Sequence, residues 1–254
     1  MLGRLVLLGG GAVMLSLPAS ADPVVMYESD FESGPLGSRW SSNALLVSTP
    51  ANQFTRFLGR HGNETVTLTL TAAPPPPDTG GGVPVGSPYP PSSPGGPASP
   101  PPPPPPPPGP QLKTVYNVSF DFYAIDSWDG SELQYGPDTF KVFANNSPIF
   151  SETFANTHLY QTYAGQPEGG RRLIGFGSNL PDAIYRQISL DFEVDPMAEQ
   201  VALKFRGAGL QALVDESWGI DNVRVSYQYV AVPAPAGLAG LAGGLVLAAR
   251  RRRR

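Results

Sequence analysis

The sequence predicts an all-β protein built around a single antiparallel β-sandwich. Short segments in which apolar and polar residues alternate recur along most of the chain, as at residues 65–71 and 116–122. No stretch between residues 22 and 229 shows a convincing 3.6-residue apolar period, so a helical domain is not expected there. A third observation concerns residues 74–110, which hold 20 of the 31 prolines and therefore cannot form packed core.

The N-terminus has the three parts of a secretory signal peptide. Arg4 supplies one positive charge, residues 5–17 form a short apolar run, and Ala19-Ser20-Ala21 is a small-residue cleavage site. We therefore expect a signal helix at residues 1–21, which passes through the Sec export machinery and is cut by signal peptidase before Asp22. An uncleaved membrane anchor is the alternative.

The proline-rich stretch is expected to interrupt one domain. Residues 22–73 are too few to bury a stable core alone without disulfides or a metal, and the chain has no cysteine. We expect them to fold together with residues 111–229, with 65–71 and 116–122 as neighbouring strands. Residues 74–110 then form a disordered Pro/Gly/Ser-rich insertion, partly stiff polyproline II, which is tolerable because loop-closure entropy grows slowly with length.

Further strands are expected after the insertion, with weaker candidates on both sides of it. The clear alternating runs lie at residues 139–143, 188–194, 200–205 and 220–227, and the weaker ones at 54–58 and 149–154. In the runs at 139–143, 188–194 and 200–205 every second residue is apolar, as in a strand with one face on a core, and the last run alternates in this way from Val223 onward. The pattern predicts short strands stacked in two sheets.

The C-terminus combines three features in a fixed order. A proline motif at residues 232–237 is followed by an apolar helix at 236–249 and an arginine cluster at 250–254. This order resembles the PEP-CTERM family of bacterial sorting signals, in its Val-Pro-x-Pro-Ala variant. The motif residues are Val232, Pro233, Pro235, Ala236, Arg250 and Arg251.

The resemblance implies that an exosortase in the inner membrane recognises residues 230–254. The protein would then be a membrane-anchored precursor that is delivered to the cell surface or extracellular matrix of a Gram-negative bacterium. Ala234 stands where the commonest version of the motif has Glu. The apolar helix would span about 21 Å of a hydrocarbon core about 30 Å thick, so it is a short transmembrane helix. An ordinary tail anchor is the alternative.

The two ends of the predicted sandwich resemble jelly-roll modules related to carbohydrate-binding modules, MAM domains and concanavalin-like lectins. The opening Asp30-Phe31-Glu32 and the closing strand at 218–225 carry the likeness. It implies a jelly roll with a structural calcium, held by Asp221 together with Asp30 or Glu32. Asp221 also shares strand parity with the apolar residues after it, so its carboxylate would face the core and need a partner. An Asp that accepts backbone N–H bonds is the alternative.

A second candidate calcium cluster follows the 116–122 run and contains Asp126, Asp129 and Asp138. Asp138 shares parity with the predicted inward residues of the next strand, although the spacing matches no known calcium loop. A polar turn between strands is the alternative. Trp128, with Tyr123 and Tyr135, is a candidate sugar-binding surface, and the alternative for Trp128 is a cap on the edge of the sandwich.

Composition narrows the function. The net charge is −4 and the basic cluster lies at the very end of the chain, which argues against nucleic-acid binding. Neither a Gly-x-Ser-x-Gly elbow nor a His-Glu-x-x-His motif occurs, and without cysteine there is neither a thiolate zinc site nor a cysteine nucleophile. We expect a non-enzymatic exported protein with a structural or adhesive sandwich stabilised by calcium. A carbohydrate-binding module for exopolysaccharide is the alternative, and a polysaccharide hydrolase or lyase is a remote one.

Overall fold

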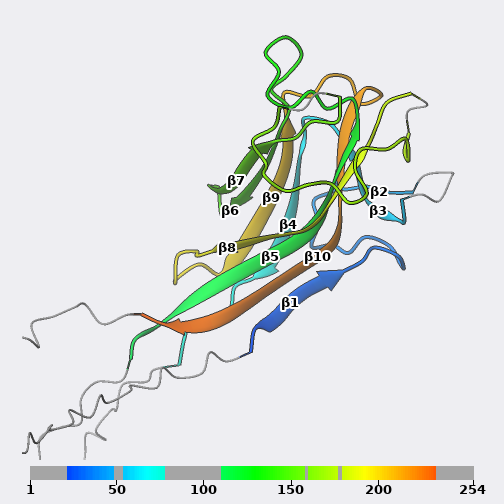
Figure 1. Ribbon diagram of the computed structural model, residues 1–254. Helices are drawn as coiled ribbons and strands as arrows, with labels where there is room; N and C mark the ends of the chain where they lie inside the picture. The colour runs from blue at the N-terminus through cyan, green and yellow to red at the C-terminus, as the bar shows by residue number, and fades with distance from the viewer. Residues whose placement is uncertain (1–21, 49–53, 78–109, 158–159, 177–178, 233–254) are drawn as a thin grey trace, which may run out of the picture.

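The computed structural model describes residues 22–48, 54–77, 110–157, 160–176 and 179–232. In this part ten strands form two antiparallel sheets, which confirms the predicted all-β sandwich (Figure 1). The same residues include no helix that is long and apolar enough to cross a membrane. The expected signal helix, most of the proline-rich insertion and the sorting signal beyond Val232 lie outside the described residues.

The larger sheet has six strands, with β1 beside β10 and the others in the order β2-β3-β10-β5-β8. The members are β1 (Val24–Ser29), β2 (Leu46–Val47), β3 (Phe57–His61), β5 (Leu112–Asp126), β8 (Ala183–Phe192) and β10 (Glu216–Ala231). The long strands β5 and β10 pair along almost their whole length and form the spine of the sheet (Figure 1).

The smaller sheet has four strands in the order β4-β9-β6-β7. They are β4 (Thr65–Thr71), β9 (Gln200–Ala208), β6 (Thr139–Ala144) and β7 (Ser147–Thr153). The prediction that residues 65–71 and 116–122 are neighbouring strands is wrong, because β4 pairs with β9 whereas β5 lies between β10 and β8. Alternation shows that a strand has one buried face, and it does not identify the pairing partner.

Strands from both sides of the proline-rich segment pair with each other in both sheets. In the larger sheet β3 pairs with β10, and in the smaller sheet β4 pairs with β9. Both partners follow the insertion in the chain, so the two segments contribute to the same core. That the two segments fold as one unit stays a prediction.

Aromatic side chains fill much of the space between the sheets, and Trp218 is fully buried among them. Its ring centroid lies 5.2 Å from that of Phe140 and 4.9 Å from that of His61. The indole Nε1 donates to the carbonyl of Gly62 at 2.7 Å. A Cβ on Gly207 would lie 2.7 Å from the indole, so a glycine there lets β9 approach this ring.

A β-bulge in β10 decides which way its polar side chains face. The register with β5 shifts between Asp221 and Arg224, and Asn222 has a left-handed φ of 50°. A bulge inserts an extra residue and breaks the two-residue alternation. Ile220 and Val223 consequently both belong to the core, and Asp221 does not share the core-facing parity that the sequence predicted for it.

Candidate metal centre

Three carboxylates meet at one end of the sandwich: those of Asp129, Asp138 and Glu216. One oxygen from each lies within 4.8 Å of the others. Asp129 is 7% exposed, and the other two are completely buried. The three come from the turn after β5, the residue before β6 and the first residue of β10. Carboxylate oxygens held together in this way could bind a metal ion.

Backbone hydrogen bonds hold two of these carboxylates in place. The N–H of Asp129 donates to Oδ2 of Asp138, and the N–H of Asp138 donates to the carbonyl of Gly130 at 2.8 Å. Gly130 has a φ of 69°, and a Cβ there would collide with a backbone carbonyl of the 160 loop. The N–H of Gln211 donates to Oε2 of Glu216. The carboxylates are therefore positioned by the fold and not by one another.

Two oxygens of the cluster have no partner. Oδ1 of Asp138 and Oε1 of Glu216 are buried, and no hydrogen-bond donor in the described part of the chain reaches them. A buried polar atom without a partner is costly, so native proteins nearly always satisfy it. Both oxygens belong to the one group of three possible metal ligands in the described residues, and a bound cation would satisfy both.

Two carboxyl groups of the cluster have raised pKa values. Burial raises the pKa of Asp138 to about 7 and that of Glu216 to about 8. The backbone N–H groups that they accept act in the opposite direction, and the neighbouring carboxylate of Asp129 raises both values further. Without a cation, these groups would hold protons near neutral pH, and a divalent cation would displace those protons on binding.

The first predicted calcium set does not form a group of three possible ligands. Asp30 and Glu32 are exposed, and Oδ1 of Asp30 accepts the N–H of Glu32 at 3.1 Å. Asp221 is buried, but its oxygens accept from Tyr123 Oη at 2.8 Å and from the N–H of Asn222 at 2.7 Å. Among the described residues, the three carboxylates above are the only group of at least three possible ligands. The bulge beside Asp221 is the physical reason why its carboxylate does not face the core.

The structure brings together two of the three residues of the second predicted set. Asp129 and Asp138 belong to the cluster, and Asp138 is buried as its parity predicted. Asp126 does not belong to it, because its carboxylate forms an ion pair with Arg60. Glu216 takes its place. The alternation from Glu216 through Trp218 to Ile220 could have shown that this glutamate faces inward.

The three candidate sugar-binding aromatics do not form one surface. Trp128 is fully buried, and its Nε1 donates to the carbonyl of Ser217 at 2.7 Å, so it caps the core and cannot stack on a ligand. Tyr123 is also buried and donates to Asp221. Tyr135 alone is exposed, at 54%. For the indole of Trp128, burial against apolar side chains at the end of the core is more favourable than exposure to water in the turn.

The known proteins do not assign a family to this chain. No protein-family model matches the chain, and no curated protein is significantly similar to it. Among solved structures, it is similar to the crystal structure of dimeric latent PorU from Porphyromonas gingivalis, with a TM-score of 0.39 and 13% sequence identity. That alignment covers 87% of this chain and 14% of the PorU chain, so the chain spans a small part of that protein's length.

Proposed function

We propose that this chain is an exported, non-enzymatic surface or matrix protein, whose β-sandwich is structural or adhesive and is stabilised by calcium. The buried cluster of Asp129, Asp138 and Glu216, with its two unpartnered oxygens, carries the calcium part of the proposal. Calcium suits this cluster because it takes six to eight oxygen ligands in flexible geometry, including backbone carbonyls. A cation at this point would connect the turn after β5 with the starts of β6 and β10.

Burial of the cluster supports a structural role over hydrolysis. A glycosidase needs two carboxyl groups that flank the bond being cut. The carboxylates of this cluster are at most 7% exposed, so they do not offer such a pair to a polysaccharide. An ion at this position would act on folding stability.

The calcium part is tested by titrating calcium into the full chain after treatment with chelator. Binding to the folded state alone stabilises it by about 2.7 kcal/mol at a hundred times the dissociation constant. We therefore expect the unfolding midpoint to rise steadily with calcium, and to rise less with magnesium, which tolerates only near-octahedral geometry. A midpoint that is the same in calcium and in chelator would contradict the proposal.

The export part rests on the two ends of the sequence. β10 ends at Ala231, and the N–H of Val232, the first residue of the sorting motif, still donates to the carbonyl of Gln111 at 2.8 Å. The proposed processing site therefore follows directly after the last strand. In a host that encodes an exosortase, the native chain should reach the cell surface or medium.

Changing Pro233→Ala and Pro235→Ala together should leave the chain in the membrane fraction as an uncut precursor. Fractionation and immunoblotting measure this outcome. Surface delivery of the double variant at the native level would count against exosortase sorting. A variant in the proline-rich insertion, Pro104→Ala, is the matched control, and we expect it to be sorted normally.

A further inference from the structure

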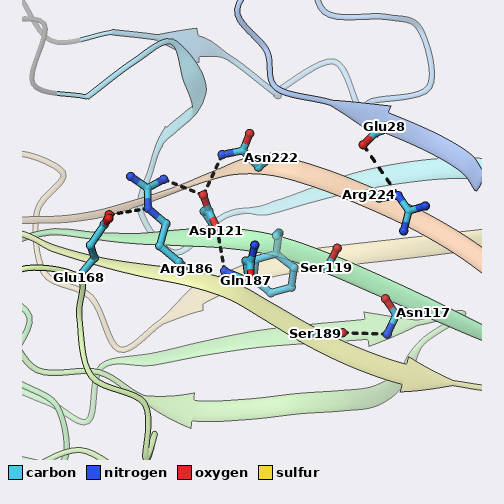
Figure 2. Close-up of a pocket in the computed structure, with 11 residues that line it drawn as sticks. Glu28, Asn117, Ser119, Asp121, Glu168, Arg186, Gln187, Ser189, Asn222 and Arg224 are labelled. Atoms are coloured by element: carbon cyan, nitrogen blue, oxygen red, sulfur yellow. Dashed lines mark hydrogen bonds and ion pairs between the residues drawn. The ribbon is translucent and has the colours of Figure 1, made fainter.

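A polar groove with a volume of about 720 Å³ crosses the larger sheet on the face away from the core (Figure 2). Asn117, Ser119 and Asp121 of β5 line it, and they alternate with core residues of the same strand. Phe120 of β5, strands β1, β8 and β10 and the loop before β8 supply the rest of the lining. Small-molecule sites commonly have volumes of about 300–1,000 Å³, so the groove has the size of a binding site.

Asp121 fixes the floor of this groove. Its Oδ1 accepts the N–H of Gln187 at 2.8 Å, and its Oδ2 accepts from Arg186 Nη1 at 2.7 Å and Asn222 Nδ2 at 2.8 Å (Figure 2). Gln187 and Asn222 both have left-handed φ angles, of 54° and 50°, at points where the sheet register shifts. One carboxylate thus ties two irregular strands together, and the groove is organised before any ligand arrives.

Several groups around the groove retain hydrogen-bonding capacity. Arg186 uses Nε on Glu168 at 2.7 Å and Nη1 on Asp121, which leaves Nη2 without a partner in the described chain. The only partner of the Arg224 guanidinium in the described chain is the carboxylate of Glu28, at 3.8 Å. The side chain of Ser119 makes no hydrogen bond to the described residues. The groove therefore offers both donors and acceptors.

The distribution of charge limits what can bind. Three carboxylates and two guanidinium groups line the groove, in the side chains of Glu28, Asp121, Glu168, Arg186 and Arg224. A strongly anionic ligand would meet the carboxylates, and a cationic one would meet the arginines. A neutral polyol avoids both penalties, because each hydroxyl can donate to a carboxylate or amide oxygen and accept from an arginine or hydroxyl.

The groove is also elongated. Glu168 and Arg186 lie at one end and Asn117 and Arg224 at the other (Figure 2). Asp121 and Asn117 are four positions apart on an extended strand, which corresponds to about 13 Å. We propose that the groove binds a segment of a linear, neutral polysaccharide through hydrogen bonds. Many copies of the chain on a surface or in a matrix would bind the same polymer together. A single groove therefore does not need an aromatic platform for the assembly to bind tightly.

This inference deepens the proposed function, because it supplies the ligand of an adhesive sandwich. It is tested by calorimetry with the full chain in calcium buffer. The neutral probes are cellohexaose, maltohexaose and mannohexaose, and the acidic probe is a galacturonate hexamer. We expect at least one neutral hexaose to bind, and the acidic hexamer to bind at least tenfold more weakly than that hexaose.

Two variants locate the site. Ser119→Trp should fill the groove, and Arg224→Gln should remove a charged donor that is loosely held in the free protein, so each should weaken binding at least tenfold. Tyr135→Ala removes an exposed aromatic outside the groove lining and should bind as the native chain does. If Ser119→Trp is unfolded by circular dichroism, Arg224→Gln decides the test alone.

The proposal is overturned if no neutral hexaose binds, if the galacturonate hexamer binds as tightly, or if the groove variants retain native affinity. Its failure can be distinguished from failure of the calcium proposal. Saccharide binding that persists although calcium leaves the unfolding midpoint unchanged would remove the calcium centre alone. A calcium-dependent midpoint without saccharide binding would remove the groove alone.

Discussion

Glu216→Gln and Asp138→Asn are each expected to make the protein less stable than the native chain in saturating calcium, yet at least as stable in chelator. The loss in calcium should approach the whole cation-dependent stabilisation, about 2.7 kcal/mol at a hundred times the dissociation constant. Chemical denaturation in calcium and in EDTA measures both free energies. The two curves for each variant should nearly coincide, whereas those of the native chain should separate.

The physical reason lies in the two unpartnered oxygens. Each carboxylate uses one oxygen to accept a backbone N–H, from Asp129 or from Gln211, and leaves the other unsatisfied. The isosteric amide can keep the first bond and place an N–H₂ donor where the unsatisfied oxygen was. In chelator this donor faces the remaining carboxylates and relieves their repulsion, but in calcium a ligand has been lost.

Asp221→Asn is the matched control, because Asp221 is a buried aspartate whose two oxygens both have partners within the protein. We expect it to keep the full difference between calcium and chelator, whatever its own effect on stability. If Asp221→Asn abolished that difference and the cluster variants kept it, calcium would bind elsewhere. The predicted centre would then be wrong.

Between pH 4 and pH 7, the stability of Asp182→Asn relative to the native chain is expected to change by up to about 3 kcal/mol. Asp182 is fully buried, and its oxygens accept the N–H groups of Asp126 at 2.9 Å and Ile174 at 3.1 Å. Burial raises its pKa from the usual 3.8 to about 6. The folded state therefore binds this proton more tightly than the unfolded chain does, and the stability that the protonated carboxyl contributes is complete below about pH 4.

That stability is lost as the pH rises through about 6. Asparagine does not titrate, so the stability of Asp182→Asn relative to the native chain should increase between pH 4 and pH 7. Urea denaturation at fixed pH values in chelator measures the difference. Asp191→Asn is the control. It changes an exposed carboxylate in β8, the strand that begins directly after Asp182, and should follow the native profile. Parallel profiles for Asp182→Asn and the native chain would show that Asp182 titrates normally in the folded state.

Most strands could be predicted because a half-buried strand must alternate. The run at 65–71 matches β4 residue for residue, and every other predicted run overlaps an observed strand. β1 and β2 were not predicted. β1 is mostly exposed or half-buried and carries an irregularity between Val25 and Tyr27, and β2 has only two residues, so neither shows a clean pattern.

The candidate site was predicted only in part. The parity of Asp138 with the inward residues of β6 correctly indicated a buried carboxylate, because a regular strand keeps its alternation. The same argument failed at Asp221, where a bulge breaks the alternation. It was not applied to Glu216, whose position opposite Asp126 depends on the pairing of β10 with β5.

By itself, therefore, the sequence determined the class of the fold and the approximate place of most strands, because these follow from local alternation and from residues that cannot be buried. Only the tertiary structure decided which strands pair, where the bulges lie and which carboxylates meet. Those features depend on contacts between residues far apart in the chain. The cluster of Asp129, Asp138 and Glu216 combines a turn and two strand ends that are up to 87 positions apart in the sequence. No local sequence pattern predicts that these residues meet.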